Sequence, residues 1–97
     1  MIYSVHLDDA AEADLKSIFE FISERASAAV AQKYIDRLLH YISGFDVFPM
    51  RGRVRNEIRH GLRIAKFERR VSIAFVVEGD KVVILRVLYG GRRYEAG

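Results

Sequence analysis

A chain of 97 residues, about half of them hydrophobic, can bury one core, and we expect a single domain over residues 1–97. It has no cysteine, which excludes disulfides and thiolate metal sites, and no apolar run long enough to span a membrane, so we expect a soluble cytoplasmic protein with no membrane partner. The formal net charge of +3 divides unevenly: residues 1–50 carry four basic and eight acidic side chains, and residues 51–97 carry twelve basic and five acidic ones.

The first half of the chain predicts a strand followed by a helix. Residues 2–7, IYSVHL, alternate roughly between apolar and polar side chains, as a short strand does. Asp9 and Glu12 then have the spacing of a capping box, and acidic side chains are favoured where a helix begins. A helix over residues 9–25 places four apolar side chains on one face: Leu15, Ile18, Phe19 and Ile22.

A second helix is predicted from Ser27, which can cap its N-terminus, to about Gly44. Its apolar stripe consists of Val30, Tyr34, Ile35, Leu38, Leu39 and Ile42, and closes on Phe45. The joint between the two helices is only Ala26 and Ser27, and so short a joint requires the helices to run antiparallel as a hairpin.

Three further strands are predicted in the second half, after a basic connector over residues 50–61 that has no clear period. LRIAKF is the first, VSIAFVV the second and KVVILRVLY the third and most apolar, with Glu78–Gly79–Asp80 as a hairpin turn before it. The order β-α-α-β-β-β indicates an α+β fold in which the helix hairpin packs on one face of a small antiparallel sheet. The leftover polar and basic side chains are expected on the other face.

The basic side chains are densest between Arg51 and Arg70, where eight of the twelve fall. They could contact the phosphates of a nucleic acid, receive an acidic protein segment, or solvate the outer face of a sheet. Phe67 is the only aromatic residue in this stretch, so the stretch alone does not indicate a stacking platform for single strands.

No sequence motif for catalysis is present, and we expect neither a metal nor a cofactor. The three histidines, His6, His40 and His60, lie in different elements without a carboxylate or a second histidine at ligand spacing. The acidic residues at 8, 9, 12 and 14 are better explained as charges that favour a helix N-terminus than as a cation site. The tail from Gly90 to Tyr94 is the most pointed local signal, because two glycines can turn the backbone and present Arg92, Arg93 and Tyr94 together.

Several segments together resemble the ParE branch of the RelE/ParE toxin superfamily. LDDAAEADLKSIFEFI is similar to the family's first helix, and AQKYIDRLLHYISGFDVFPMRGR is similar to the second helix with the segment that follows it. GLRIAKFERRVSIAFVVEGDKVVILRVLYGGRR resembles the family's last three strands and their HGxR ending, with Tyr89 in place of the usual histidine and Arg93 in place of the usual acidic residue.

This resemblance implies the toxin of a type II toxin–antitoxin system that inhibits DNA gyrase by binding and is neutralised by a ParD-like antitoxin. Operator DNA would then be bound by the complex, through the antitoxin. The residues expected to engage the target are Arg86, Arg92, Arg93, Tyr94, Arg59 and Arg63. The residues expected to contact the antitoxin are Phe21, Lys66 and Arg70.

Two alternatives remain open on the sequence. A RelE-like, ribosome-dependent mRNA endonuclease would use Lys66, Arg70, Arg86 and Tyr94, with the cations stabilising the phosphorane and Tyr94 or Lys66 moving protons. A degenerate toxin, retained only as a partner of its antitoxin, is the second alternative, and the replacement of the family's histidine by Tyr89 is the feature that favours it.

Overall fold

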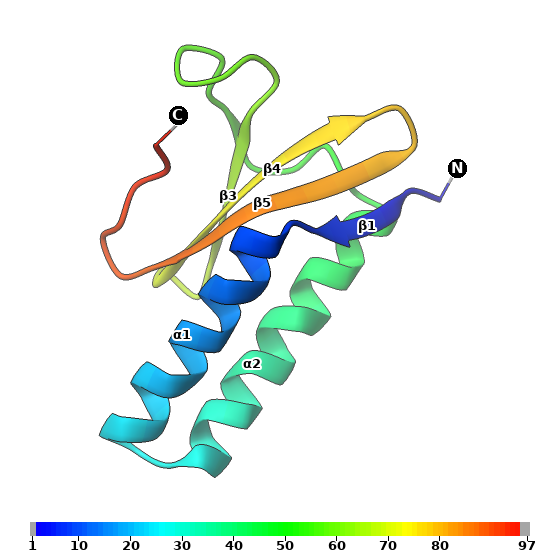
Figure 1. The fold of residues 1–97 in the computed structure, drawn as a ribbon. Helices are drawn as coiled ribbons and strands as arrows, with labels where there is room; N and C mark the ends of the chain where they lie inside the picture. The colour runs from blue at the N-terminus through cyan, green and yellow to red at the C-terminus, as the bar shows by residue number, and fades with distance from the viewer. Residues whose placement is uncertain (1, 96–97) are drawn as a thin grey trace.

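The computed structural model describes residues 2–95, in which two helices lie on one face of a five-stranded sheet (Figure 1). The strands are β1 (Ser4–Leu7), β2 (Arg53–Val54), β3 (Arg63–Phe67), β4 (Val71–Glu78) and β5 (Lys81–Tyr89). The helices are α1 (Asp9–Arg25) and α2 (Ala28–Ser43), followed by a turn of 3₁₀ helix, η1 (Gly44–Asp46). The predicted α+β fold with a helix hairpin on one sheet face is confirmed.

The two helices begin and end close to where the sequence predicts them. Ser27 caps α2 as expected, because its Oγ accepts a hydrogen bond from the Val30 N–H at 3.1 Å. The capping box predicted for α1 is wrong. Asp8, and not Asp9, is the N-cap residue, and its side chain makes no capping hydrogen bond. The acidic residues of the first turn therefore act on this helix end only through their charge.

The sheet is mixed, with strand order β1-β5-β4-β3-β2, so the prediction of an antiparallel sheet is wrong for the β1 edge. The strand pairs β2–β3, β3–β4 and β4–β5 are antiparallel, whereas β1 pairs in parallel with β5, from Ser4 opposite Lys81 to Leu7 opposite Ile84. A parallel pair needs a long connection, and residues 8–80, which include both helices and β2 to β4, lie between β1 and β5. The alternation of residues 2–7 predicts a strand but does not encode the direction of its partner.

The connector over residues 50–61 contains a strand that the sequence does not reveal. Arg53 and Val54 pair with β3 and form one edge of the sheet. Gly52 precedes them with a φ of +78°, and a Cβ placed on it would lie 2.4 Å from the carbonyl oxygen of Ile64. Only glycine allows the connector to approach β3 this closely.

A tight turn joins β3 to β4 and is tied to α2. Glu68 and Arg69 both have positive φ, 47° and 63°, and the Arg70 N–H donates to the Phe67 carbonyl at 3.2 Å. The guanidinium of Arg37 donates to both carboxylate oxygens of Glu68 at 3.0 Å, and this lowers the pKa of Glu68. The pair connects the turn to the middle of α2.

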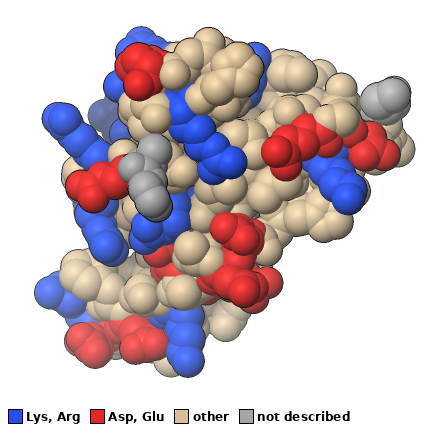
Figure 2. Space-filling model, turned by 45° about the horizontal axis from the view of Figure 1, so that its top comes forward, with Lys and Arg blue, Asp and Glu red and all other residues tan. Residues whose placement is uncertain are grey.

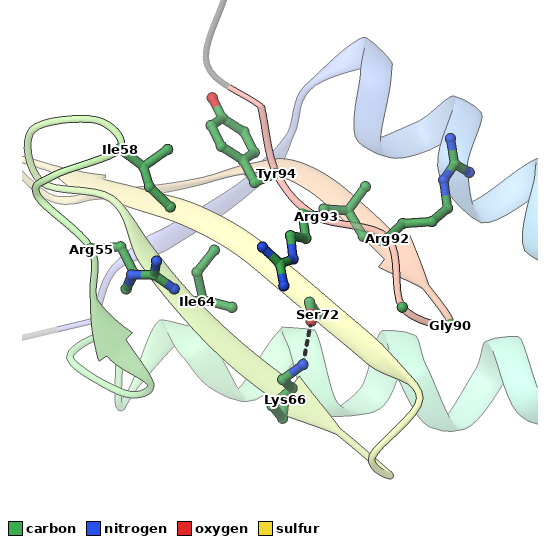
Figure 3. A pocket seen from close by; sticks show the side chains of 11 residues that line it. Arg55, Ile58, Ile64, Lys66, Ser72, Gly90, Arg92, Arg93 and Tyr94 are labelled. Carbon is green, nitrogen blue, oxygen red and sulfur yellow. Dashed lines mark hydrogen bonds between the residues drawn. The ribbon is translucent and has the colours of Figure 1, made fainter.

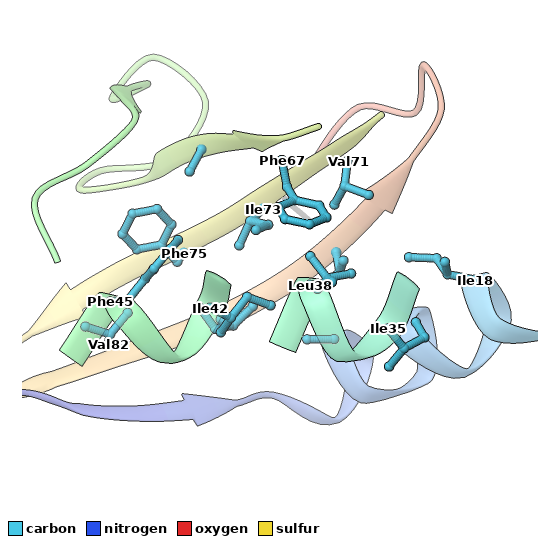
Figure 4. Close-up of a cluster of buried hydrophobic side chains, with 14 of the residues drawn as sticks. Ile18, Ile35, Leu38, Ile42, Phe45, Phe67, Val71, Ile73, Phe75 and Val82 are labelled. Carbon is cyan, nitrogen blue, oxygen red and sulfur yellow. The ribbon is translucent and has the colours of Figure 1, made fainter. Parts of the chain in front are cut away.

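The core lies between the helices and the sheet (Figure 4). Aromatic rings link its layers, with Phe45 beside Phe75 at a centroid distance of 4.8 Å and Tyr34 edge-on to Phe67 at 5.8 Å. The hydroxyl of Tyr34 is buried without a hydrogen-bond partner, and burial raises the pKa of Tyr34. The labelled side chains of Figure 4 are Ile18, Ile35, Leu38, Ile42, Phe45, Phe67, Val71, Ile73, Phe75 and Val82. Neither helix of the described residues is long and apolar enough to cross a membrane.

Candidate functional site

The face of the sheet opposite the helices carries a cavity of about 630 Å³, which we call the open-face groove (Figure 3). Its floor comes from β3, β4 and β5, one wall comes from the connector, and the other wall comes from the segment that follows β5. Eleven residues line it: Arg55, Ile58, Ile64, Lys66, Ser72, Leu88, Gly90, Gly91, Arg92, Arg93 and Tyr94.

The floor of the groove fixes one ammonium group. Lys66 on β3 lies opposite Ser72 on β4, and its Nζ donates to the Ser72 Oγ at 2.8 Å. Ser72 is buried, and its hydrogen bond holds the lysine side chain across the surface of the sheet. Ile64 and Leu88 provide apolar floor beside this pair.

The segment after β5 turns back over the open face. Gly90 makes the turn with a φ of +73°, and its N–H donates to the Arg70 carbonyl at 2.7 Å. Figure 1 shows the segment returning toward the connector, and Figure 3 shows its two arginines diverging. Arg93 extends across the groove toward Ser72 and Lys66, whereas Arg92 extends toward α1. The adjacent arginines therefore serve different surfaces.

The connector closes the groove from the other side. Tyr94 lies toward Ile58 (Figure 3). The Arg59 Nη1 donates to the Tyr94 hydroxyl at 3.4 Å, and this contact joins the two walls. Arg55 is one of the residues that line the groove. Its Nε forms an ion pair with Glu57, which lowers the pKa of Glu57.

The lining is cationic and apolar. Among residues 2–95 it contains four cations, Arg55, Lys66, Arg92 and Arg93, and no carboxylate or histidine side chain. A shallow depression adjoins the groove and does include a carboxylate, that of Glu95. The other residues that line this depression are Arg86, Leu88, Arg92 and Arg93. On the face drawn in Figure 2, the largest gathering of Lys and Arg is at the left of the view, with few carboxylates among it. The groove is thus suited to an anionic ligand with apolar parts.

Arg86 has a partner within the fold. Its Nε and Nη2 donate to the two carboxylate oxygens of Asp14 at 2.7 and 2.8 Å, and this pairing raises the pKa of Arg86. The Val87 N–H donates to the same carboxylate at 2.9 Å. Asp14 was expected among the charges at the helix N-terminus, and this is wrong, because it lies buried beyond the first turn of α1. Since β1 pairs with β5 only as far as Ile84, Asp14 satisfies an edge N–H that β1 no longer reaches.

A second cavity, of about 430 Å³, lies between α1 and the end of β5; we call it the helix-side pocket. It is mostly apolar, and Phe21 and Tyr89 contribute rings whose centroids are 5.4 Å apart. Phe21 is 40% exposed, and the guanidinium of Arg25 covers its ring at 3.7 Å. The lining residues are Asp14, Ser17, Ile18, Phe21, Val87, Tyr89, Gly90 and Arg92.

The structure separates the sequence-predicted site residues into groups. Lys66, Arg92, Arg93 and Tyr94 line the open-face groove, with Arg59 at its rim through Tyr94. Arg63 donates to the Arg51 carbonyl at 3.5 Å, and Arg70 lies exposed at the β3–β4 turn; neither lines the groove. The residues proposed for mRNA cleavage are thus divided, because Lys66 and Tyr94 line the groove whereas Arg70 and Arg86 do not.

Sequence reasoning did not single out five groove residues: Arg55, Ile58, Ile64, Ser72 and Leu88. Ser72 had a usable signal, since it alternates with the apolar residues of a predicted strand and must face away from the helices. Arg55 was covered only by the basic stretch from Arg51 to Arg70 as a whole, and Ile58 had no signal, because the connector has no period. Among residues 2–95, no three histidine or carboxylate side chains gather in a way that could hold a metal ion.

Comparison with known proteins places this geometry in context. Residues 5–94 match the family described as ParE toxin of type II toxin–antitoxin system, parDE. Toxin ParE3 of Caulobacter vibrioides is 31% identical over 77 residues, which are 79% of this chain and 76% of that protein.

Two solved structures share the fold. A chain from the chromosomal ParDE toxin–antitoxin system of P. aeruginosa superposes with a TM-score of 0.81 at 23% identity, covering 92% of this chain and 97% of that one. A chain from the RelBE2 toxin–antitoxin complex of Mycobacterium tuberculosis gives a TM-score of 0.67 at 17% identity, covering 92% of this chain and 99% of that one.

Proposed function

The chain belongs to the ParE family of toxins of type II toxin–antitoxin systems, and on that premise we propose that it inhibits DNA gyrase by binding and is neutralised by a ParD-like antitoxin. The proposal places the protein in the cytoplasm, where gyrase acts. The observation that carries it is the open-face groove, a recess to which the described part of the chain contributes four cations and no carboxylate or histidine side chain. Such a surface can engage an enzyme on DNA through charge and shape, without chemistry of its own.

The target-binding residues that we propose centre on the tail. Arg93 and Tyr94 face the groove, Arg59 contacts Tyr94, and Arg92 bridges the groove and the helix-side pocket. Arg86 and Arg63 remain proposed contributors, although both also hold the fold together, through Asp14 and through the Arg51 carbonyl.

The helix-side pocket supports a proposal for the antitoxin. An apolar side chain of a bound antitoxin segment would cover the exposed ring of Phe21. Lys66, on the floor of the open-face groove, and Arg70, at the β3–β4 turn, lie outside this pocket, and acidic residues elsewhere in the antitoxin would contact them. We propose that the toxin–antitoxin complex binds operator DNA through the antitoxin, which leaves the cations of this chain for the antitoxin and the target.

The mRNA endonuclease remains the second candidate, because Lys66 and Tyr94 line one groove. Against it, Arg86 is paired with Asp14 and Arg70 lies outside the groove, so only two of the four residues expected to cleave RNA lie together.

The test is to induce the chain alone in bacteria and to follow thymidine and methionine incorporation together. Gyrase inhibition predicts that DNA synthesis stops first, and that purified toxin blocks supercoiling and traps cleaved DNA in a purified gyrase reaction. An earlier arrest of protein synthesis would instead support mRNA cleavage, and unchanged growth would support the hypothesis of a degenerate toxin.

A matched pair of variants assigns the effect to the groove. Arg93→Ala removes a groove cation and should weaken gyrase inhibition by about tenfold, the loss expected for one charged contact at an interface. Lys81→Ala removes the same charge from the exposed start of β5, outside the groove lining, and should leave inhibition unchanged. Equal losses in the two variants would rule out the groove as the target surface.

A further inference from the structure

We propose that Arg37 of α2 is a positioning residue for the tail. Through Glu68 it holds the strained β3–β4 turn, and that turn sets the direction in which the tail leaves β5. The inference rests on the proposed function in one respect, which is that Arg93 and Tyr94 of the tail engage the target. Three observations support it: the strain of the turn, the contacts that hold the turn, and the hydrogen bond that joins it to the tail.

The β3–β4 turn has a backbone conformation that its residues do not favour. Glu68 and Arg69 occupy the two central positions, and both have positive φ. Residues with a Cβ are unfavourable there, and hairpin turns with positive φ at both central positions usually carry Asn and Gly. Among residues 2–95, these two are the only residues other than glycine with positive φ. Such strain persists only where the surrounding structure holds it.

The ion pair with Arg37 supplies this hold. The guanidinium donates to both carboxylate oxygens of Glu68 at 3.0 Å, and a contact at two points fixes the direction of the carboxylate as well as its position. The pairing lowers the pKa of Glu68 and raises the pKa of Arg37. Both side chains are about half exposed, so the pair adds little to the stability of the whole molecule. We therefore expect its effect at the turn.

A ring of α2 packs against both strands that meet at this end of the sheet. Tyr34 lies edge-on to Phe67, the last residue of β3, and to Tyr89, the last residue of β5, at centroid distances of 5.8 and 6.2 Å. The guanidinium carbon of Arg37 lies 5.2 Å from the centre of the Tyr34 ring. One face of α2 thus contacts the turn and the residue that precedes the tail.

A single backbone hydrogen bond joins the turn to the tail. The Gly90 N–H donates at 2.7 Å to the carbonyl of Arg70, the residue that closes the turn. Figure 1 shows the turn beside the point where the tail leaves β5. A Cβ placed on Gly90 would meet nothing within 4 Å, so this hydrogen bond, rather than close packing around the glycine, fixes the backbone there. If the turn moved, Arg93 and Tyr94 would lose their places in the open-face groove.

The test follows amide hydrogen exchange of isotope-labelled toxin by NMR, with the Gly90 N–H as the reporter. Arg37→Ala should speed this exchange about threefold, the effect of a favourable exposed ion pair, while amides in the middle of β4 keep their parent rates. Lys33→Ala removes the same charge from an exposed position one turn earlier on α2 and should leave Gly90 unchanged. Parent-like exchange in Arg37→Ala, or equal acceleration in Lys33→Ala, would overturn the inference.

New turn residues separate the hold on the turn from other effects of Arg37. The double change Glu68→Asn with Arg69→Gly supplies residues that favour positive φ and removes the ion pair. Because this turn no longer depends on α2, Arg37→Ala should leave Gly90 exchange unchanged in that background. An equal acceleration in both backgrounds would show that Arg37 acts through another contact, such as the Tyr34 ring, and would contradict the inference.

The effect on the tail and on the target is measured with the same variants, and circular dichroism confirms that each is folded. Since the chain has no cysteine, Glu95→Cys accepts a single spin label, and its mobility should rise in Arg37→Ala. The toxin concentration that half-inhibits gyrase supercoiling should rise about threefold in Arg37→Ala and stay at the parent value in Lys33→Ala.

The outcomes distinguish this inference from the proposed function. A more mobile tail in Arg37→Ala without weaker inhibition would overturn the inference, because the target would not need the tail in one position. A parent toxin that does not inhibit gyrase contradicts only the proposed function, because exchange at Gly90 and label mobility are measured without gyrase.

Discussion

At the scale of single residues, Asp14 shows how one carboxylate can complete a strand. It accepts two hydrogen bonds from Arg86 and one from the Val87 N–H, and it is only 8% exposed. The donors belong to adjacent residues of β5, so one side chain of α1 fixes both the backbone and a side chain where β1 has ended. Where two strands are paired in this sheet, backbone N–H groups donate to the neighbouring strand instead.

Replacing Asp14 by alanine should lower the free energy of unfolding by about 2–3 kcal/mol, because it leaves a half-buried guanidinium and an edge N–H without partners. Urea denaturation measures the loss. Asp9→Ala, which removes an exposed carboxylate from the same helix, should cost less than about 1 kcal/mol. If the two variants lose the same stability, the contacts of Asp14 contribute nothing beyond the charge of α1.

The hydroxyl of Tyr34 gives a prediction of opposite sign. It is buried without a partner, so Tyr34→Phe should raise the free energy of unfolding by up to about 1 kcal/mol while keeping the ring contacts with Phe67 and Tyr89.

Alkaline pH should enlarge this difference. Burial raises the pKa of Tyr34 above its ordinary value of 10.0, so above that pH the unfolded chain ionises first and the parent loses stability relative to the variant. Urea melts at neutral pH and above pH 10 measure both effects, and a parent that stays as stable as the variant at high pH would contradict the assignment.

At the scale of elements, the connector shows where sequence patterns fail. The two helices were predicted to within a few residues because their apolar stripes repeat and Ser27 and Gly44 mark their limits. β2 was missed because two residues cannot show a period. The parallel direction of β1 was missed because a strand's own residues do not name its neighbour.

The candidate site was predictable only in part, for the same physical reason. The tail residues Arg92, Arg93 and Tyr94 stand out locally, since two glycines precede them. The ion pair of Arg86 with Asp14 joins residues 72 positions apart, and no local pattern reports a contact over that separation. Nor could the sequence show that Arg93 and Arg92 diverge, because their directions depend on the turn at Gly90.

Gly52 and Gly61 have the same φ of +78°, so alanine variants of the two distinguish the cost of a steric clash from the cost of backbone strain. At Gly52 a Cβ would meet the Ile64 carbonyl oxygen at 2.4 Å, whereas at Gly61 it would meet nothing within 4 Å. Gly61→Ala should therefore cost about 1 kcal/mol and Gly52→Ala about 3 kcal/mol or more. Thermal or urea unfolding compares them, and equal costs would show that the connector can move away from β3.

At the scale of the whole molecule, the two faces of the sheet differ in what covers them. The helix-covered face holds the core, and the open face holds the cationic groove with the tail across it. Charge follows this division, since the acidic half of the chain forms the helices and the basic half forms most of the sheet.

Truncation after Gly91 tests this division. Arg92, Arg93 and Glu95 are exposed, and the Gly90 N–H remains to hold the turn, so the melting temperature should change by only a few degrees. Toxicity in cells should nevertheless be lost, because Arg93 and Tyr94 are removed from the groove. A truncated chain that folds and still stops growth would place the target surface elsewhere.

The position of β5 between β1 and β4 has a consequence for folding during synthesis of the chain. A nascent chain leaves the ribosome N-terminus first, so β1 and the helix hairpin emerge while their partner strand is still being made. The apolar face of the hairpin then has no sheet to cover it, and the open-face groove does not yet exist. The groove is completed only once residues 81–94 have left the ribosome, so under the proposed function the nascent chain should not yet inhibit its target.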